Sequence, residues 1–356
     1  MPAIAPVRAA DMQATLTRDL EQVLATGSLA EGRGVGVAIG LVRDGERRVL
    51  AFGSAKPDAL FEIGSLTKTF TGLMLAQLIE QGRVAAEQPV RELLPPGAVA
   101  KPAGAEISLL DLVTQRSGLP RLPANLQPAD DANPYVGYGR PQLYAFLAEH
   151  GVQKPEAPEF LYSNLGFGLL GEALAERAGS DYAALLRELV TEPLCLGETV
   201  VTLSAEQRAR LIQGLGRDGR PAPNWDWDAM AGCGALRSTA GDMLKYLEAQ
   251  LGPEQSCSAP ASAASGTLAA ALRRSQEPRA EGMPGRQIAF AWFHGPKSGT
   301  YFHDGGTGAY SSYALFNPTR RYAVVALVNQ AGSQLAARIA RHIEQRFAGE
   351  PAVEIK

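Results

Sequence analysis

The sequence predicts one domain of mixed α/β (α+β) class, in which helices flank an antiparallel sheet and a second lobe is largely helical. Segments with strand character lie near both ends of the chain, helical patterns occupy the middle, and no internal repeat is found. The 356 residues suffice for a single domain built as two lobes. We place the α/β lobe at about residues 1–64 and 200–356, and the helical lobe at about 65–199.

The first strands are expected to form a hairpin. Val35–Val42 is an apolar segment interrupted by glycine, and Arg48–Phe52 is a second short segment with strand character. Asp44-Gly45 between them is a favoured two-residue turn. An amphipathic helical pattern over Ala9–Leu24 precedes the hairpin.

The middle of the chain is predicted to be helical apart from one long loop. Apolar residues recur at helical spacing from Leu66 to Leu78, and Gly82 follows as a C-terminal stop. Residues 115–141 are rich in Pro, Gly, Asn and Asp, which is typical of a functional or disordered loop. Further helices are expected at Pro141–Glu149, Asn164–Arg177, Tyr182–Leu189 and Thr239–Leu251.

The C-terminal part is expected to supply most of the sheet. Residues 254–267 are rich in Ser, Ala and Pro and are expected to form a flexible surface excursion. A helix over Gln334–Arg346 is expected to close the chain. Successive antiparallel strands are predicted at Ile288–Phe293, Tyr301–His303, Tyr310–Phe316 and Tyr322–Asn329.

Composition excludes several classes of protein. The net charge of -3 and the lack of a basic stripe argue against a nucleic-acid partner. The sequence has no run of about 18 apolar residues, so no membrane span is expected. Cys195, Cys233 and Cys257 are widely spaced, without a C-x-x-C pair, so we expect reduced or incidental thiols and no metal or other cofactor. The N-terminus lacks a signal-peptide pattern. The expected location is cytoplasmic, or periplasmic or secreted if an export signal has been removed.

The segment from Phe61 to Lys68 carries the strongest chemical signal. Ser65 precedes Lys68 by three residues at the start of a helical pattern, so the two side chains share one helix face. A desolvated lysine can remove the proton of a serine hydroxyl and activate it as a nucleophile. The alternative is that Ser65 only caps the helix and Lys68 points into water.

Two further motifs are ambiguous when taken alone. Tyr162-Ser163-Asn164 precedes a helix, where the tyrosine could simply pack and a neighbour could act as the cap. His303–Gly308 lies between two predicted strands and could be a glycine-rich turn with an incidental histidine. A Ser-His-Asp triad of Ser65, His303 and Asp304 would leave the placement of lysine and tyrosine unexplained.

In this order, the three motifs resemble the serine β-lactamase and penicillin-recognising enzyme superfamily, with its S-x-x-K, Y-x-N and K-T-G or H-x-G elements. The class C β-lactamase branch is most similar, together with D-alanyl-D-alanine carboxypeptidases and family VIII carboxylesterases. The resemblance extends over Phe61–Val84, Leu112–Pro120, Leu161–Leu174, Gly232–Asp242 and His303–Asn329. It implies a β-lactamase/transpeptidase-like fold, with the active site between the two lobes.

The resemblance also implies roles for individual residues. Ser65 would attack the carbonyl carbon, and Lys68 and Tyr162 would share the proton transfers, with the primary base left open. Asn164 would hold Lys68 and the acyl side chain, and His303 would occupy the first position of the third motif. The backbone N–H groups of Ser65 and Gly306 would form the oxyanion hole.

The substrate pocket is expected to involve residues from three segments. Gly305 lets substrate approach the strand backbone closely, and Thr307 follows the oxyanion glycine. We also expect four aromatic residues in the pocket wall, although lobe packing is an equal alternative for the tryptophans: Tyr135, Tyr138, Trp225 and Trp227.

The expected activity is that of a metal-free serine hydrolase acting through an acyl-enzyme on esters, with some β-lactam hydrolysis. Dedicated class C β-lactamases usually carry lysine where this chain has His303, which is mostly neutral at pH 7. The alternatives are a D-alanyl-D-alanine carboxypeptidase, a dedicated class C β-lactamase, or a penicillin-binding sensor that deacylates slowly. The partner would be a small ester, a β-lactam or a D-Ala-terminated peptide, and the oligomeric state is left open.

Overall fold

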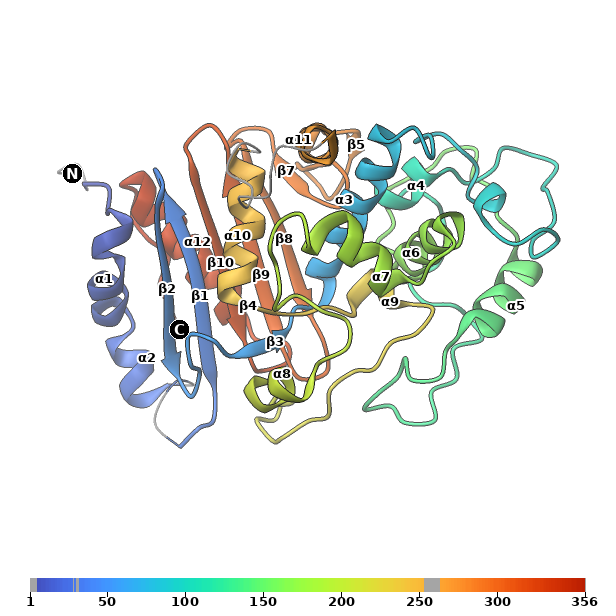
Figure 1. Ribbon diagram of the computed structural model, residues 1–356. Helices are drawn as coiled ribbons and strands as arrows, with labels where there is room; N and C mark the ends of the chain where they lie inside the picture. Colours follow the sequence, from blue (N-terminus) through green and yellow to red (C-terminus); the bar gives the residue numbers. More distant parts are fainter. Residues whose placement is uncertain (1–4, 28, 30–31, 253–262, 356) are drawn as a thin grey trace.

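The computed structural model describes residues 5–27, 29, 32–252 and 263–355. Within them, eight strands form one antiparallel sheet in the order β2-β1-β10-β9-β8-β7-β6-β5 (Figure 1). The strands are β1 (Gly36–Arg43), β2 (Glu46–Gly53), β5 (Ala280–Glu281), β6 (Gln287–Ile288), β7 (Phe293–Gly295), β8 (Thr300–Gly306), β9 (Ser311–Asn317) and β10 (Tyr322–Val328). A separate pair joins β3 (Leu60–Glu62) to β4 (Arg237–Thr239).

The helices surround this sheet and extend beyond one edge of it (Figure 1). They are α1 (Met12–Asp19), α2 (Glu21–Thr26), α3 (Thr67–Glu80), α4 (Leu109–Val113), α5 (Arg140–His150), α6 (Asn164–Ala178), α7 (Tyr182–Leu186), α8 (Ala205–Arg210), α9 (Ala231–Gly234), α10 (Ala240–Leu251), α11 (Ala263–Gln276) and α12 (Leu335–Ala348). The 3-10 turns are η1 (Ala9–Asp11), η2 (Gly64–Leu66) and η3 (Val90–Leu93), and a π turn over Arg187–Thr191 follows α7. The predicted mixed α/β class with an antiparallel sheet is confirmed.

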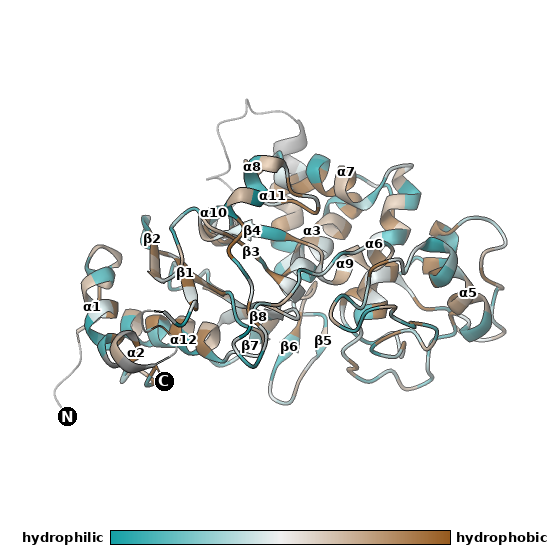
Figure 2. Ribbon diagram, turned by 90° about the horizontal axis from the view of Figure 1, so that it is seen from below, coloured by the Kyte–Doolittle hydropathy of each residue, from teal (hydrophilic) through white to brown (hydrophobic). Residues whose placement is uncertain are grey.

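Alternation along the central strands divides the core into two layers. Val37, Ile39 and Leu41 of β1 pack in the cluster that contains α12, whereas Ala38 and Val42 pack in the other cluster, with α10. This is the period of two expected for a strand covered on both faces. Figure 2 shows α10 and α12 on opposite sides of the sheet.

Helix α3 is the centre of the molecule. Every residue from Thr67 to Leu78 is buried, because the helix packs against α6, α7, α9 and α11. A helix that is buried on all sides holds even its polar side chains in the interior. The first turn of α3 therefore places Lys68 inside the protein.

The predicted strand over Ile288–Phe293 is wrong in its middle. Residues 289–292 separate β6 from β7, and their backbone bonds elsewhere: Phe290 N–H donates to the Ser275 carbonyl and Ala291 N–H to the Val113 carbonyl. Ala291 also has a φ of 69°, outside the strand region. This turn packs directly against α3 at Gly72, where a β-carbon would lie only 2.7 Å from the Phe290 carbonyl oxygen.

Two other expectations need correction. Residues 263–267 belong to α11 and are not an irregular excursion, while 254–262 of that prediction lie outside the described residues. Cys195 is disulfide-bonded, which contradicts the expectation of reduced thiols, whereas Cys233 is free and buried. Among the described helices, none is long and apolar enough to cross a membrane.

Candidate active site

Ser65 and Lys68 lie at the junction between β3 and α3. Ser65 belongs to the 3-10 turn η2 and is half-buried, whereas Lys68 on the first turn of α3 is completely buried. The Lys68 Nζ atom lies 3.0 Å from Ser65 Oγ, as the i, i+3 spacing predicts. No side-chain cap bond is made at this turn, so the capping alternative for Ser65 is not supported.

Lys68 Nζ is held by three oxygen atoms from three parts of the chain. Besides Ser65 Oγ, it contacts Asn164 Oδ1 at 2.9 Å and the Cys233 carbonyl oxygen at 2.7 Å. Asn164 begins α6 and Cys233 lies on α9, so three helices converge on one nitrogen. An amine with three acceptors in this arrangement has one fixed position opposite the serine hydroxyl.

The Tyr162 ring lies beside the same nitrogen. Its centroid is 5.0 Å from Lys68 Nζ and its centre is 6.4 Å from the centre of the His303 ring. Ser163 caps α6 by accepting a hydrogen bond from Gly166 N–H at 2.8 Å. The capping role thus falls to Ser163, which leaves Tyr162 and Asn164 on either side of it next to the Lys68 amine.

The edge of β8 comes into direct backbone contact with the Ser65 turn. Gly64 has a φ of +51°, and a β-carbon built on it would lie 2.5 Å from Gly306 N. A β-carbon on Gly305 would clash with the Ile63 carbonyl oxygen and lie 3.1 Å from Ser65 N. Only glycine permits this approach, and for Gly64 also this backbone conformation.

The Gly306 amide faces away from β9. Thr307 N–H donates to the Tyr310 carbonyl, so by antiparallel alternation the next pair, Gly306 and Ser311, is a non-hydrogen-bonded pair. On the other side, β7 pairs with β8 only as far as Phe302. The Gly306 N–H therefore has no strand partner and lies next to the Ser65 turn, as an oxyanion donor must.

His303 is buried and neutral. The pKa of His303 is lowered to about 4, mainly by burial; Asp304 opposes this shift, and Lys68 nearby adds to it. Its Nδ1–H donates to the Asp304 carbonyl at 2.5 Å, which leaves Nε2 as an acceptor. The third motif thus contributes no positive charge near neutral pH.

Three of the four predicted wall aromatics form one cluster. The Tyr135 ring stacks on Trp227 with centroids 4.1 Å apart and meets Trp225 edge-on at 5.3 Å. Asn164 Nδ2 donates to the Tyr135 hydroxyl at 3.3 Å, which joins the cluster to the Lys68 group. Burial raises the pKa of Tyr135 above its ordinary value, so this phenol stays protonated.

Thr307 and Tyr138 differ in their placement. Thr307 is buried directly after Gly306, and Gly308 beyond it packs against the Trp225 indole. Tyr138 instead donates to Asn125 Oδ1 at 2.8 Å, and no contact between it and the Lys68 group is found in the described part of the chain. Its place in the pocket wall stays a prediction.

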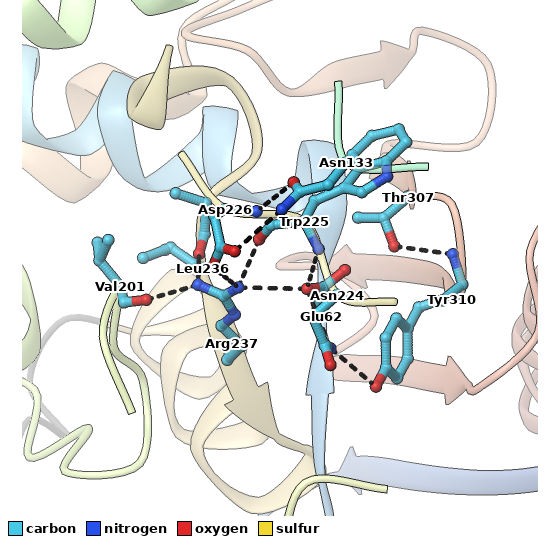
Figure 3. Close-up of polar contacts among 12 residues, drawn as sticks. Glu62, Asn133, Val201, Asn224, Trp225, Asp226, Leu236, Arg237, Thr307 and Tyr310 are labelled. Atoms are coloured by element: carbon cyan, nitrogen blue, oxygen red, sulfur yellow. Dashed lines mark hydrogen bonds and ion pairs between the residues drawn. The ribbon is translucent and has the colours of Figure 1, made fainter. Parts of the chain in front are cut away.

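A buried ion pair anchors the segment that carries Trp225 (Figure 3). Glu62 and Arg237 are directly opposite each other on β3 and β4, with Glu62 Oε1 3.3 Å from Arg237 Nη2. Glu62 Oε1 also accepts from Trp225 N–H at 2.9 Å, and Arg237 donates to the Trp225 carbonyl at 2.5 Å. Both charged side chains are less than a tenth exposed. The pair therefore ties the main chain of Trp225 to Glu62, which lies three residues before Ser65.

Sequence reasoning missed Glu62, Arg237 and the Cys233 carbonyl. The position of Glu62 between Phe61 and Ile63, in an apolar run, could have predicted a buried carboxylate with a charged partner. A backbone carbonyl such as that of Cys233 has no sequence signal at all. Among the described residues, no group of three or more His, Cys, Asp or Glu could hold a metal ion.

The fold and the convergence on Lys68 place this protein among the serine hydrolases of the β-lactamase and penicillin-recognising superfamily. The chain belongs to the Beta-lactamase family, whose sequence profile matches residues 16–346. The suspected superfamily is thereby confirmed. Two solved structures share the fold: a class C β-lactamase from Rhodobacter sphaeroides (TM-score 0.74, 22% identity, covering 93% of this chain and 97% of that one) and another class C β-lactamase (TM-score 0.77, 18% identity, covering 96% of each).

Two curated relatives are similar in sequence over part of the chain. The D-alanyl-D-alanine-carboxypeptidase/endopeptidase AmpH of Escherichia coli (strain K12) is 34% identical over 59% of this chain and 56% of its own length. A β-lactamase of Pseudomonas fluorescens is 26% identical over 61% of this chain and 60% of its own length. The matched region thus spans less than two thirds of either relative.

We expect Arg237→Met to destabilise the protein by about 3–5 kcal/mol, because it leaves the Glu62 carboxylate buried without its cation. Urea unfolding monitored by tryptophan fluorescence measures this change. Adding Glu62→Gln should recover part of the loss, whereas Arg8→Met, at the exposed Arg8–Asp11 pair, should have a much smaller effect. A loss below about 1 kcal/mol for Arg237→Met would contradict the anchoring role.

Acid should weaken the protein through His303. Its pKa is about 4 when folded and near 6.5 when unfolded, so between these values only the unfolded chain binds the proton. Stability should therefore fall as the pH drops from 6.5 to 4, by about 2 kcal/mol relative to His303→Gln. Unfolding curves of both proteins at pH 7, 5.5 and 4 measure this difference. A difference that stays constant with pH would show that His303 is not held neutral.

Proposed function

We propose that this protein hydrolyses carboxylic esters of modest acyl size through a covalent acyl-enzyme on Ser65, with β-lactam hydrolysis as a companion activity. The observation that carries the proposal is the contact of Lys68 Nζ with Ser65 Oγ and Asn164 Oδ1, beside the Tyr162 ring. This arrangement supplies a nucleophile, a neighbouring base and a group that orients the base.

In the first step, Ser65 Oγ forms a bond to the carbonyl carbon and gives up its proton. If Lys68 is neutral, its two N–H bonds point to Asn164 and Cys233 and its lone pair faces the serine, so it takes the proton itself. If Lys68 is charged, its third N–H donates to Ser65 Oγ, and Tyr162 is the group left to accept the proton. Both routes place the base next to the nucleophile.

The developing oxyanion would be bound by the N–H groups of Ser65 and Gly306. Collapse of the tetrahedral intermediate breaks the bond to the leaving alkoxide, which receives the proton from the Lys68–Tyr162 pair. A water molecule then attacks the acyl-Ser65 ester by the reverse proton path and releases the acid. Each oxyanion donor contributes about a hundredfold to a thousandfold in rate in comparable enzymes.

A neutral His303 supports the preference for esters. A lysine at this position would offer a fixed positive charge to the carboxylate of a β-lactam, and buried neutral imidazole offers none. Neutral ester substrates do not need that charge.

A D-alanyl-D-alanine carboxypeptidase is the second candidate, and the 34% identity to AmpH favours it. It would use the same acyl-enzyme but release a terminal D-alanine as the leaving group. A slowly deacylating penicillin sensor differs from both in its second step, because it would show one stoichiometric burst without turnover.

The compartment is a separate proposal. A disulfide at Cys195 persists in an oxidising environment, which supports the periplasmic or secreted alternative over the cytoplasm.

The activity is tested by measuring p-nitrophenyl butyrate, a chromogenic cephalosporin and a D-Ala-D-Ala peptide side by side. We expect steady turnover of the ester, slower turnover of the cephalosporin, and a loss of at least about 10⁴-fold for Ser65→Ala. Lys68→Ala should lose about 10²–10⁴-fold. Peptide turnover faster than ester turnover would replace the first candidate by the second, and a single burst without turnover would favour the sensor.

His303→Lys should raise the ratio of cephalosporin to ester kcat/KM by about tenfold or more, because a hydrogen bond to a charged group contributes about 1.5 kcal/mol and about 1.4 kcal/mol changes a rate tenfold. The matched variant His303→Gln adds no charge and should leave the ratio near that of the natural protein. Equal ratios in all three proteins would argue against charge at this position as the reason for ester preference.

A further inference from the structure

Arg121 is a cation beside the Tyr162 ring of the site. Its guanidinium carbon lies 5.1 Å from the centroid of the Tyr162 ring, the same ring that lies 5.0 Å from Lys68 Nζ. Unlike Lys68, Arg121 is exposed to solvent. The two basic side chains therefore share one aromatic ring, and only Arg121 is exposed to an incoming charged group.

The backbone of Arg121 is built into the site. Its carbonyl oxygen accepts from Asn164 N–H at 3.0 Å and from Leu165 N–H at 3.2 Å, at the start of α6. One residue earlier, the Pro120 carbonyl accepts from the Ser163 hydroxyl at 2.7 Å. These bonds fix the main chain of Arg121 relative to Tyr162 and Asn164 without involving the guanidinium.

The guanidinium itself has no acidic partner. In the described part of the chain, its side chain makes no hydrogen bond or ion pair, and its guanidinium lies over the Tyr162 ring. Arg140, by contrast, pairs with the Glu172 carboxylate at 2.5 Å. Five donors in a planar fork remain available beside the proposed nucleophile.

We propose that Arg121 is a specificity-determining residue that binds a carboxylate carried by the substrate away from the bond that is cleaved. This rests on the proposed ester hydrolysis at Ser65. Its contact with the Tyr162 ring holds the guanidinium beside the site, and its planar fork matches a carboxylate in bidentate geometry. His303 on β8 supplies no charge, so the cation that selects an anionic substrate is Arg121, next to the start of α6.

The test uses three chromogenic esters: one is neutral, and the other two carry a carboxylate at different positions. They are p-nitrophenyl butyrate, mono-p-nitrophenyl glutarate with a carboxylate on the acyl arm, and 3-carboxy-4-nitrophenyl butyrate with one on the leaving group. For each protein, kcat/KM of each charged ester is divided by that of the neutral ester. Arg121→Gln should lower one of these two ratios by about tenfold, mainly through KM, and the affected ester identifies the arm. Arg121→Lys should retain most of that ratio.

Two controls separate binding from structure. Arg48→Gln removes the same charge from the far edge strand β2 and should leave both ratios unchanged. Raising NaCl from 0.05 to 0.5 M should lower the affected ratio in the natural protein but not in Arg121→Gln. Ratios that move less than twofold in Arg121→Gln, or that fall equally in Arg121→Lys, would overturn the proposal. If Ser65→Ala hydrolyses all three esters as fast as the natural protein does, the ester function itself is wrong, and the proposal about Arg121 fails with it.

Discussion

The contact between the Lys68 amine and three oxygen atoms is the constraint on which the rest of the structure depends. Ser65, Asn164 and Cys233 come from segments far apart in the chain, and each places an oxygen within 3.0 Å of Nζ. A polar nitrogen buried this completely must have all its partners in place. The packing of α6 and α9 against α3 can therefore be understood as the arrangement that satisfies this one group.

A second requirement is close approach of two backbones. Gly64 and Gly305 let the Ser65 turn touch β8, and a single β-carbon at either position would separate them. The buried Glu62–Arg237 pair holds the same β3 segment from the other side and ties it to Trp225. Burying two charges is seldom a net gain in stability, so we interpret this pair as a device for position. The pair thus contributes to fixed distances between Ser65, the edge of β8 and Trp225 rather than to stability.

Much of this could be predicted from sequence because it depends on local periodicity. The Asp44-Gly45 turn correctly indicated the β1–β2 hairpin, and the i, i+3 spacing correctly brought Ser65 and Lys68 together. What could not be predicted depends on backbone groups meeting over long range. The Cys233 carbonyl and the break between β6 and β7 at Ala291 have no local pattern. The sequence shows that residue 121 is an arginine, but its contact with the Tyr162 ring depends on how the loop folds.

Membership of the Beta-lactamase family supports serine-hydrolase chemistry but does not identify the substrate. The central claim is that Ser65 is activated by Lys68, and intact-protein mass spectrometry with a fluorophosphonate probe, followed by peptide mapping, tests it most directly. We expect one adduct per chain, located on Ser65, and a labelling rate that falls by about 10²–10⁴-fold in Lys68→Met. An adduct on another residue, or an equal labelling rate without the lysine, would contradict it.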